Sequence, residues 1–98
     1  MKTYWVSLYL EISSKDDLKK YGESAIPIIK RFGGKPLVRG GKYQSFSGPK
    51  IIRTVIWEFP SYERALLCHE SEDYKKAWAF AKDSTKRTMF IVEGVPSE

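Results

Sequence analysis

Arg39 is the residue in this sequence whose type and setting best suit it to bind an anion. It follows a short apolar run in the stretch FGGKPLVRGGKYQ, residues 32–44, where a strand is predicted. A guanidinium held on a strand face away from water needs a carboxylate or an anionic ligand beside it. Glu58 is the first expected protein partner and Glu93 the second, across the sheet or across a dimer interface. The other interpretation is that Arg39 anchors the anionic group of a small molecule.

The two glycine pairs of this stretch do not predict a phosphate-binding loop. GGKPLVRGG matches neither G-x-G-x-x-G nor G-x-x-x-x-G-K-[ST], and no helix is predicted to begin after it. Gly33-Gly34 is instead expected to end a helix, and Gly40-Gly41 to form a bulge in a strand.

The only cysteine and the only histidine are adjacent, at Cys68 and His69. Neighbouring residues of a helix point about 100° apart, so His69 should not activate the sulfur of Cys68. Cys68 is predicted to be a small buried hydrophobe. His69 fits either a contact with the carbonyls at a helix end or a general base near neutral pH. The chain has no Cys/His spacing suited to zinc, and we predict neither a metal nor a cofactor.

Length, charge and aromatic content limit the classes of protein to which this sequence can belong. The length of 98 residues predicts a single domain spanning residues 1–98. The net charge of +5 comes from basic residues interleaved with acidic ones, which argues against nucleic-acid binding. Three Trp, six Tyr and five Phe exceed what a small core needs, which indicates a partner surface or a pocket wall. Because neither a signal peptide nor a membrane span is recognisable, we expect a cytoplasmic protein without membrane contact.

Hydrophobic periodicity predicts alternating strands and helices. A kink or a break is expected at Pro27, inside the first helix. The order β-α-β-β-α-(α)-β predicts a ferredoxin-like α+β fold, with a four-stranded antiparallel sheet and helices on one face. The predicted elements are strands at 4–12, 35–46, 51–59 and 84–95, and helices at 14–32, 61–70 and 71–83.

The second face of such a sheet must be covered or polar. We expect this face to carry Trp5, Tyr9 and large side chains from residues 51–59. Each fully buried large apolar side chain contributes about 1.5–3 kcal/mol, so leaving the face in water would be costly. Pairing two sheets face to face in a two-fold homodimer removes this cost.

Four short motifs in register resemble one family over about Trp5 to Val95: FGGKPLVRGG, EFPSYERAL, SEDY and FIVEGV. They are similar to the domain-of-unknown-function family numbered 1330, small bacterial proteins of the dimeric α/β-barrel group. The resemblance implies a ferredoxin-like fold paired into a barrel-like dimer. Relatives of this architecture include monooxygenases, isomerases, dehalogenases, haem-degrading enzymes and binding proteins, so the fold does not select a chemistry.

The family pattern emphasises several positions of this chain and differs at others. This chain has Cys68-His69 where the family commonly shows an aromatic pair, and Ala81-Lys82 near a position that is often basic. The emphasised positions are Gly33-Gly34, Arg39-Gly40-Gly41, Glu58-Phe59-Pro60-Ser61, Ser71, Tyr74 and Glu93-Gly94.

Three functions remain open at this point. The first is binding of a small, anionic molecule in a pocket between the sheet and the helices, near the dimer interface. The second is a non-catalytic assembly or regulatory module, and the third is a cofactor-free enzyme resembling monooxygenases or isomerases. The candidate pocket has Arg39, Glu58, Tyr21 and His69 as its polar lining and Trp57 and Trp78 as its walls.

Overall fold

The structure is a computed structural model that describes residues 1–96. It contains four strands and three helices in the predicted order. None of the helices in this part of the chain is long and apolar enough to cross a membrane. The elements are β1 (Thr3–Ile12), α1 (Lys15–Arg31), β2 (Lys35–Arg39), β3 (Arg53–Phe59), α2 (Tyr62–Glu70), α3 (Glu72–Trp78) and β4 (Thr85–Glu93).

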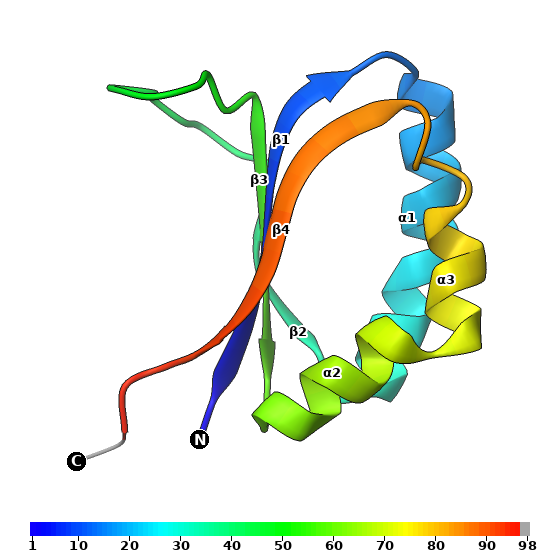
Figure 1. Cartoon of the computed structure of the whole chain (residues 1–98), viewed down its shortest axis with the longest axis vertical. Helices are drawn as coiled ribbons and strands as arrows, with labels where there is room; N and C mark the ends of the chain where they lie inside the picture. The colour runs from blue at the N-terminus through cyan, green and yellow to red at the C-terminus, as the bar shows by residue number, and fades with distance from the viewer. Residues whose placement is uncertain (97–98) are drawn as a thin grey trace.

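The strands form one antiparallel sheet in the order β2-β3-β1-β4. All three helices cover the same face of this sheet, and the opposite face carries no helix (Figure 1). The predicted ferredoxin-like α+β architecture is therefore confirmed.

Local signals define both ends of α1. The Ser14 hydroxyl accepts a hydrogen bond from the backbone N–H of Asp17, which makes Ser14 the N-cap. Gly33, with φ of 97°, follows the C-cap and ends the helix as predicted. The expected break at Pro27 is wrong, because α1 runs through this residue without interruption. Pro27 lies on the exposed side of the helix, where water can bind the carbonyl of Glu23 that loses its N–H partner.

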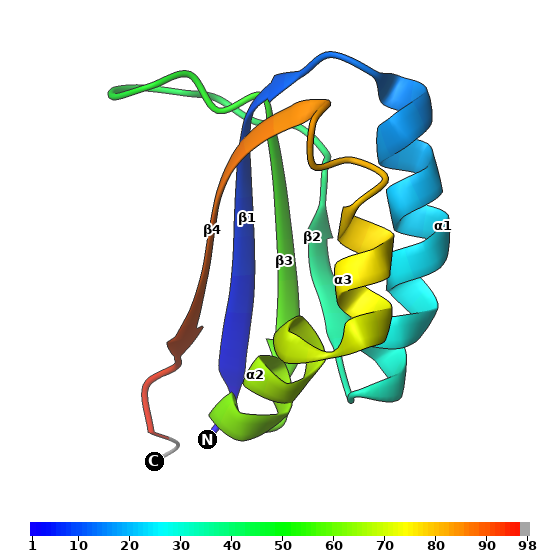
Figure 2. The same cartoon turned by 45° about the vertical axis from the view of Figure 1, so that its right-hand side comes forward.

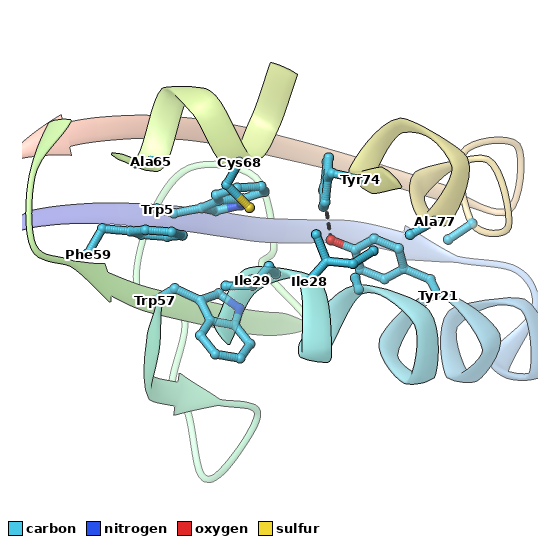
Figure 3. Packing of buried hydrophobic residues seen from close by; sticks show 12 residues of the cluster. Trp5, Tyr21, Ile28, Ile29, Trp57, Phe59, Ala65, Cys68, Tyr74 and Ala77 are labelled. Carbon is cyan, nitrogen blue, oxygen red and sulfur yellow. Dashed lines mark hydrogen bonds between the residues drawn. The ribbon is translucent and has the colours of Figure 1, made fainter. Parts of the chain in front are cut away.

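Aromatic side chains from the sheet and the helices form the core between the two layers. Trp5 and Phe59 stack with ring centroids 5.9 Å apart, and the Tyr74 ring meets Trp5 edge-on at 4.8 Å. Ile29 of α1 and Cys68 of α2 close the same cluster, which Figure 3 shows from nearby. These contacts hold α1, α2 and α3 against one face of the sheet.

The expected assignment of the faces of β1 is wrong. Trp5 and Tyr9 are 1% and 2% exposed and face the helices, together with Ser7. Alternation predicts two rows of side chains but does not say which row meets the helices. The large aromatic rings fill the gap between sheet and helices, which leaves the aliphatic row on the helix-free face. This open face, as we call it, comprises Tyr4, Val6, Leu8, Leu10, Thr54, Ile56, Glu58, Thr88, Phe90 and Val92.

The segment from residue 40 to residue 52 differs from the prediction. β2 ends at Arg39 instead of continuing to residue 46, because Gly40 and Gly41 adopt φ of 77° and 92° and turn the chain. The irregularity in the pairing of β2 with β3 falls between Pro36 and Val38, ahead of the glycines. Residues 40–52 form a long loop that projects on the side of the sheet away from the helices (Figures 1 and 2).

Two glycines near α1 should respond oppositely to alanine. A Cβ on Gly34 would lie 2.4 Å from Ile29 Cγ2 and 2.9 Å from the Ile29 carbonyl oxygen, so Gly34→Ala should destabilise the fold by about 1–3 kcal/mol. A Cβ on Gly22 meets only Ile26 Cδ1 at 3.9 Å, so Gly22→Ala should stabilise the helix by about 0.5–1 kcal/mol. Urea unfolding of both variants measures the two effects, and equal shifts would contradict this packing.

Candidate functional site

A cavity of about 490 Å³ lies between α1 and the strands β1, β2 and β3. Its volume falls in the range of about 300–1,000 Å³ that is typical of small-molecule sites. The aromatic and aliphatic part of its wall comes from both layers of the fold. These residues are Leu18, Ala25, Ile26 and Ile29 of α1, Val55 and Trp57 of β3, and Tyr9 and Tyr21.

The charged part of the cavity wall is strongly basic. Four basic residues line it against one carboxylate, that of Glu23. The basic residues come from the first turns of α1 and from the facing ends of β2 and β3: Lys15, Lys19, Arg39 and Arg53. Cations gathered beside low-dielectric walls raise the local concentration of anions.

Gly40 makes room for one of these cations. A Cβ at this position would lie only 2.7 Å from Nη1 of Arg53, so the guanidinium rests directly against the glycine backbone. The Gly40 N–H also donates to the carbonyl of Thr54 at 2.9 Å, which holds the turn against β3. The first glycine of the second pair therefore leaves room for Arg53 beside the cavity, a role that the sequence does not reveal.

Arg39 and Glu58 do not form the expected pair. Arg39 is opposite Val55 in the β2–β3 ladder and lines the cavity on the helix side. Glu58 has the other parity and lies on the open face, where its carboxylate is 3.6 Å from the ammonium of Lys2. Arg39 and Glu58 lie on neighbouring strands but have opposite parity, so their side chains emerge from opposite faces of the sheet.

The other predicted site residues divide into two groups. Tyr21 and Trp57 line the cavity, as Arg39 does. His69 lies elsewhere, near the end of α2, with its Nδ1 3.3 Å from a Glu70 carboxylate oxygen. Trp78 of α3 does not line the cavity but stacks against an arginine, described next.

Arg87 of β4 is the centre of a hydrogen-bonded cluster that the sequence does not single out. Its Nη2 donates to the hydroxyl of Tyr74 at 2.8 Å, and its Nη1 lies 3.3 Å from the hydroxyl of Tyr21 and 3.5 Å from that of Tyr9. The hydroxyls of Tyr21 and Tyr74 are 2.7 Å apart, as the dashed line in Figure 3 shows. The guanidinium carbon lies 3.5 Å from the centroid of the Trp78 ring. We call these five residues the Arg87 cluster.

Burial keeps the tyrosines of the Arg87 cluster neutral. It raises the pKa of Tyr9, of Tyr21 and of Tyr74, and the positive charge of Arg87 offsets only part of this effect. Burial also lowers the pKa of Arg87, but the tyrosine oxygens raise it more, so the guanidinium stays charged. No ion pair within residues 1–96 includes Arg87, so its charge is balanced by hydroxyl dipoles and by the face of the Trp78 ring.

Strand register explains why this cluster forms. Tyr9 is opposite Arg87 on β4 and opposite Arg53 on β3, so the three side chains stand in one row on the helix side. Tyr21 of α1 and Tyr74 of α3 extend toward this row from the helix layer. Pairing β1 with β4 in this register is the one signal that could have placed Arg87 beside Tyr9 in advance.

Cys68 is not among the residues that line this cavity. Cys68 is fully buried, as predicted, and burial raises the pKa of its thiol to about 12. A thiol in this state is a poor nucleophile at neutral pH. Within residues 1–96, no three side chains of the His, Cys, Asp and Glu types are grouped to hold a metal ion.

The buried tyrosines should make the fold sensitive to alkali. Unfolded tyrosines ionise near pH 10, but Tyr9, Tyr21 and Tyr74 keep their protons to higher pH because burial raises each pKa. Above about pH 10 the unfolded chain therefore binds fewer protons than the folded chain, and the free energy of unfolding falls as pH rises. Each such tyrosine should contribute about 1 kcal/mol of this loss by about pH 11.

Urea unfolding at pH 9 and pH 11 measures this loss. Tyr21→Phe should show a smaller drop between the two pH values than the wild type, by about 1 kcal/mol. Tyr62→Phe is the matched control, because Tyr62 is 38% exposed. Identical drops in the wild type and in Tyr21→Phe would contradict the role assigned to burial.

Solved structures share this fold with little sequence identity. A protein of unknown function from Rhodopseudomonas palustris has a TM-score of 0.72 and 16% identity, over 98% of this chain and 84% of that one. A putative antibiotic biosynthesis monooxygenase from Nitrosomonas europaea has a TM-score of 0.56 and 18% identity, over 98% and 100%. A dimeric ferredoxin-like protein of unknown function from Thermobifida fusca has a TM-score of 0.54 and 11% identity, over 93% and 89%. At such identities the likeness shows the fold alone.

Comparison with curated proteins gives no match. The model of one protein family, described as a domain of unknown function (DUF1330), matches residues 2–95. This match covers all four strands and all three helices. The resemblance of the four motifs is thereby confirmed, and the chain belongs to the DUF1330 family.

Proposed function

We propose that this protein is a homodimer that binds a small anionic molecule in the cavity between α1 and the sheet. The observation that carries the proposal is the composition of the cavity wall, in which four basic residues face one carboxylate beside an aromatic and aliphatic surface. Such a wall suits a ligand with an apolar body and an acidic group. The body would lie against Trp57 and Ile29, and the acidic group near Arg53 and Arg39.

The dimer is proposed to form through the open face of the sheet. Val6, Leu8 and Leu10 of the central strand are only half-buried, and the edge-strand residues Phe90 and Val92 are 42% and 46% exposed. An apolar surface of this kind usually marks an association site. Two-fold pairing places the same surface of each chain against the other, so apolar side chains meet apolar side chains.

The loop of residues 40–52 supports a second copy as the occupant of the open face. It projects on the side of the sheet that carries no helix (Figure 1). Its Phe46 is 91% exposed, and a second copy bound to the open face would bury part of this side chain. The Thermobifida fusca protein with this fold is described as dimeric, which fits the same arrangement.

Ligand binding is tested by thermal unfolding with a panel of small aromatic and aliphatic acids. A ligand at about 100 times its Kd stabilises the fold by about 2.7 kcal/mol, which should raise Tm by several degrees. Arg53→Gln should weaken binding by about tenfold, because it removes a half-buried charge from the cavity, and Arg39→Ala by about threefold at its exposed position.

Lys75→Ala is the matched control for these variants. Lys75 is exposed on α3 and does not line the cavity, but its loss lowers the net charge by the same amount. Equal loss of binding in Lys75→Ala and Arg53→Gln would point to attraction by net charge alone. Absence of stabilisation by every acid in the panel would overturn the binding function and favour an assembly module.

Dimer formation is tested by sedimentation of the wild type and Val6→Glu at micromolar concentration. Val6 lies in the middle of the open face, opposite Ile56 on β3 and Phe90 on β4. A carboxylate there would be desolvated next to its two-fold mate, so dimerisation should weaken at least tenfold. Leu67→Glu on the exposed side of α2, where Leu67 is 55% exposed, should leave the dimer intact. A wild type that sediments as one chain would overturn the dimer.

A further inference from the structure

We propose that the Arg87 cluster holds the anionic oxygen of the ligand, and that the ligand is a flat, largely apolar molecule bearing this oxyanion. The inference rests on the proposed binding function and adds the group that the ligand presents. Its basis is a surplus of hydrogen-bond donors around Tyr9 and Tyr21, two side chains that belong to the Arg87 cluster and also line the cavity.

The donor surplus follows from counting protons. Each of the three tyrosine hydroxyls accepts a hydrogen bond from Arg87, so each retains one proton to donate. The contact between Tyr21 and Tyr74 uses one of these protons. The other two, those of Tyr9 and of one member of the pair, find no acceptor among the hydrogen bonds formed within residues 1–96.

The direction of the Tyr21–Tyr74 hydrogen bond decides which hydroxyl keeps a surplus proton. Tyr21 lines the cavity and Tyr74 does not. Either hydroxyl of the Tyr21–Tyr74 pair can be the donor. When Tyr74 donates to Tyr21, the proton of Tyr21 is free beside that of Tyr9, and both tyrosines line the cavity. Tyr9 and Tyr21 are 2% and 9% exposed, so bulk water is a poor competitor for these donors.

Two guanidiniums flank the same position. Tyr9 stands between Arg53 on β3 and Arg87 on β4 in the cross-strand row. Arg87 is held in place by Trp78 and by the hydroxyls, and the guanidinium of Arg53 lies close to Gly40. An acceptor in the cavity beside Tyr9 is therefore close to hydroxyl donors and to the positive charge of Arg53, with the charge of Arg87 one hydrogen bond behind the tyrosines. This surrounding favours an anionic oxygen over a neutral one.

The cavity wall defines the rest of the ligand. Trp57, Val55 and Ile29 offer flat aromatic and aliphatic surface next to the donor cluster. A ring compound with an ionised hydroxyl or a carboxylate satisfies both surfaces. Because the neighbouring hydroxyls and guanidiniums stabilise the charged form, a ring hydroxyl should ionise at lower pH when bound than when free.

The experiment uses 4-nitrophenol and benzoate as probes of full-length protein. The visible absorbance of nitrophenolate reports the protonation state of the bound probe across a pH titration. In the wild type we expect the anion to bind at least tenfold more tightly than the neutral phenol, which lowers its pKa by about one unit. Benzoate, followed by competition with nitrophenol, distinguishes a carboxylate from a ring oxyanion.

Tyr9→Phe and Tyr21→Phe each remove a hydroxyl and keep the ring. Each should reduce the preference for the anion by about threefold to tenfold. Tyr62→Phe is the control, because Tyr62 lies on α2 outside the cavity wall. Circular dichroism melts confirm that each variant is folded, and Arg87→Lys supplies a third variant that keeps the charge and loses the forked geometry.

Each outcome decides the inference. Loss of the anion preference in Tyr9→Phe or Tyr21→Phe, with Tyr62→Phe unchanged, supports it for whichever probe binds. Binding that depends on Arg53 but is the same in the wild type, Tyr9→Phe and Tyr21→Phe overturns it and leaves the proposed function standing. Binding of neither probe to the wild type overturns the inference, whereas the proposed function is decided by the full panel of acids.

Discussion

The buried charge of Arg87 is the constraint on which the two layers of this fold depend. A guanidinium does not lose its proton at any ordinary pH, so a half-buried one must be surrounded by oxygen atoms or aromatic faces. Here the oxygens come from β1, α1 and α3, through Tyr9, Tyr21 and Tyr74. Satisfying one side chain of β4 therefore fixes the distance between the sheet and two helices, and with it one wall of the cavity.

The elements of the fold could be predicted because their signals are local. Ser14, Ser61 and Ser71 cap the helices as their neighbours in sequence suggest, and alternation identifies the strands. Alternation also separates the two faces of β4, with Phe90 on one face and Met89 on the other. Alternation does not say which row of β1 meets the helices, because one row is aliphatic, the other carries Trp5 and Tyr9, and only the packing of the aromatic rings decides between them.

The candidate site could be predicted only in part, because its geometry depends on contacts between distant segments. Tyr21, Trp57 and Arg39 line the cavity. Glu58 is on the strand next to Arg39, but the opposite parity of the two residues places it on the other face of the sheet. The sequence does not indicate the role of Arg87 for a related reason. Its partner Tyr9 is 78 residues away, and only the β1–β4 register brings the two side chains together.

The balance of donors and acceptors limits what chemistry the cavity can support. The carboxylate of Glu23 is the single acidic group on the part of the wall that the structure describes, and it belongs to an exposed residue of α1. The tyrosines beside Arg87 hold their protons more tightly than free tyrosine, so they donate hydrogen bonds and do not abstract protons. A site built in this way stabilises negative charge that a ligand already carries or readily forms. If a reaction occurs here, the acidity must come from the ligand, and the protein contributes by holding the resulting anion in a defined orientation.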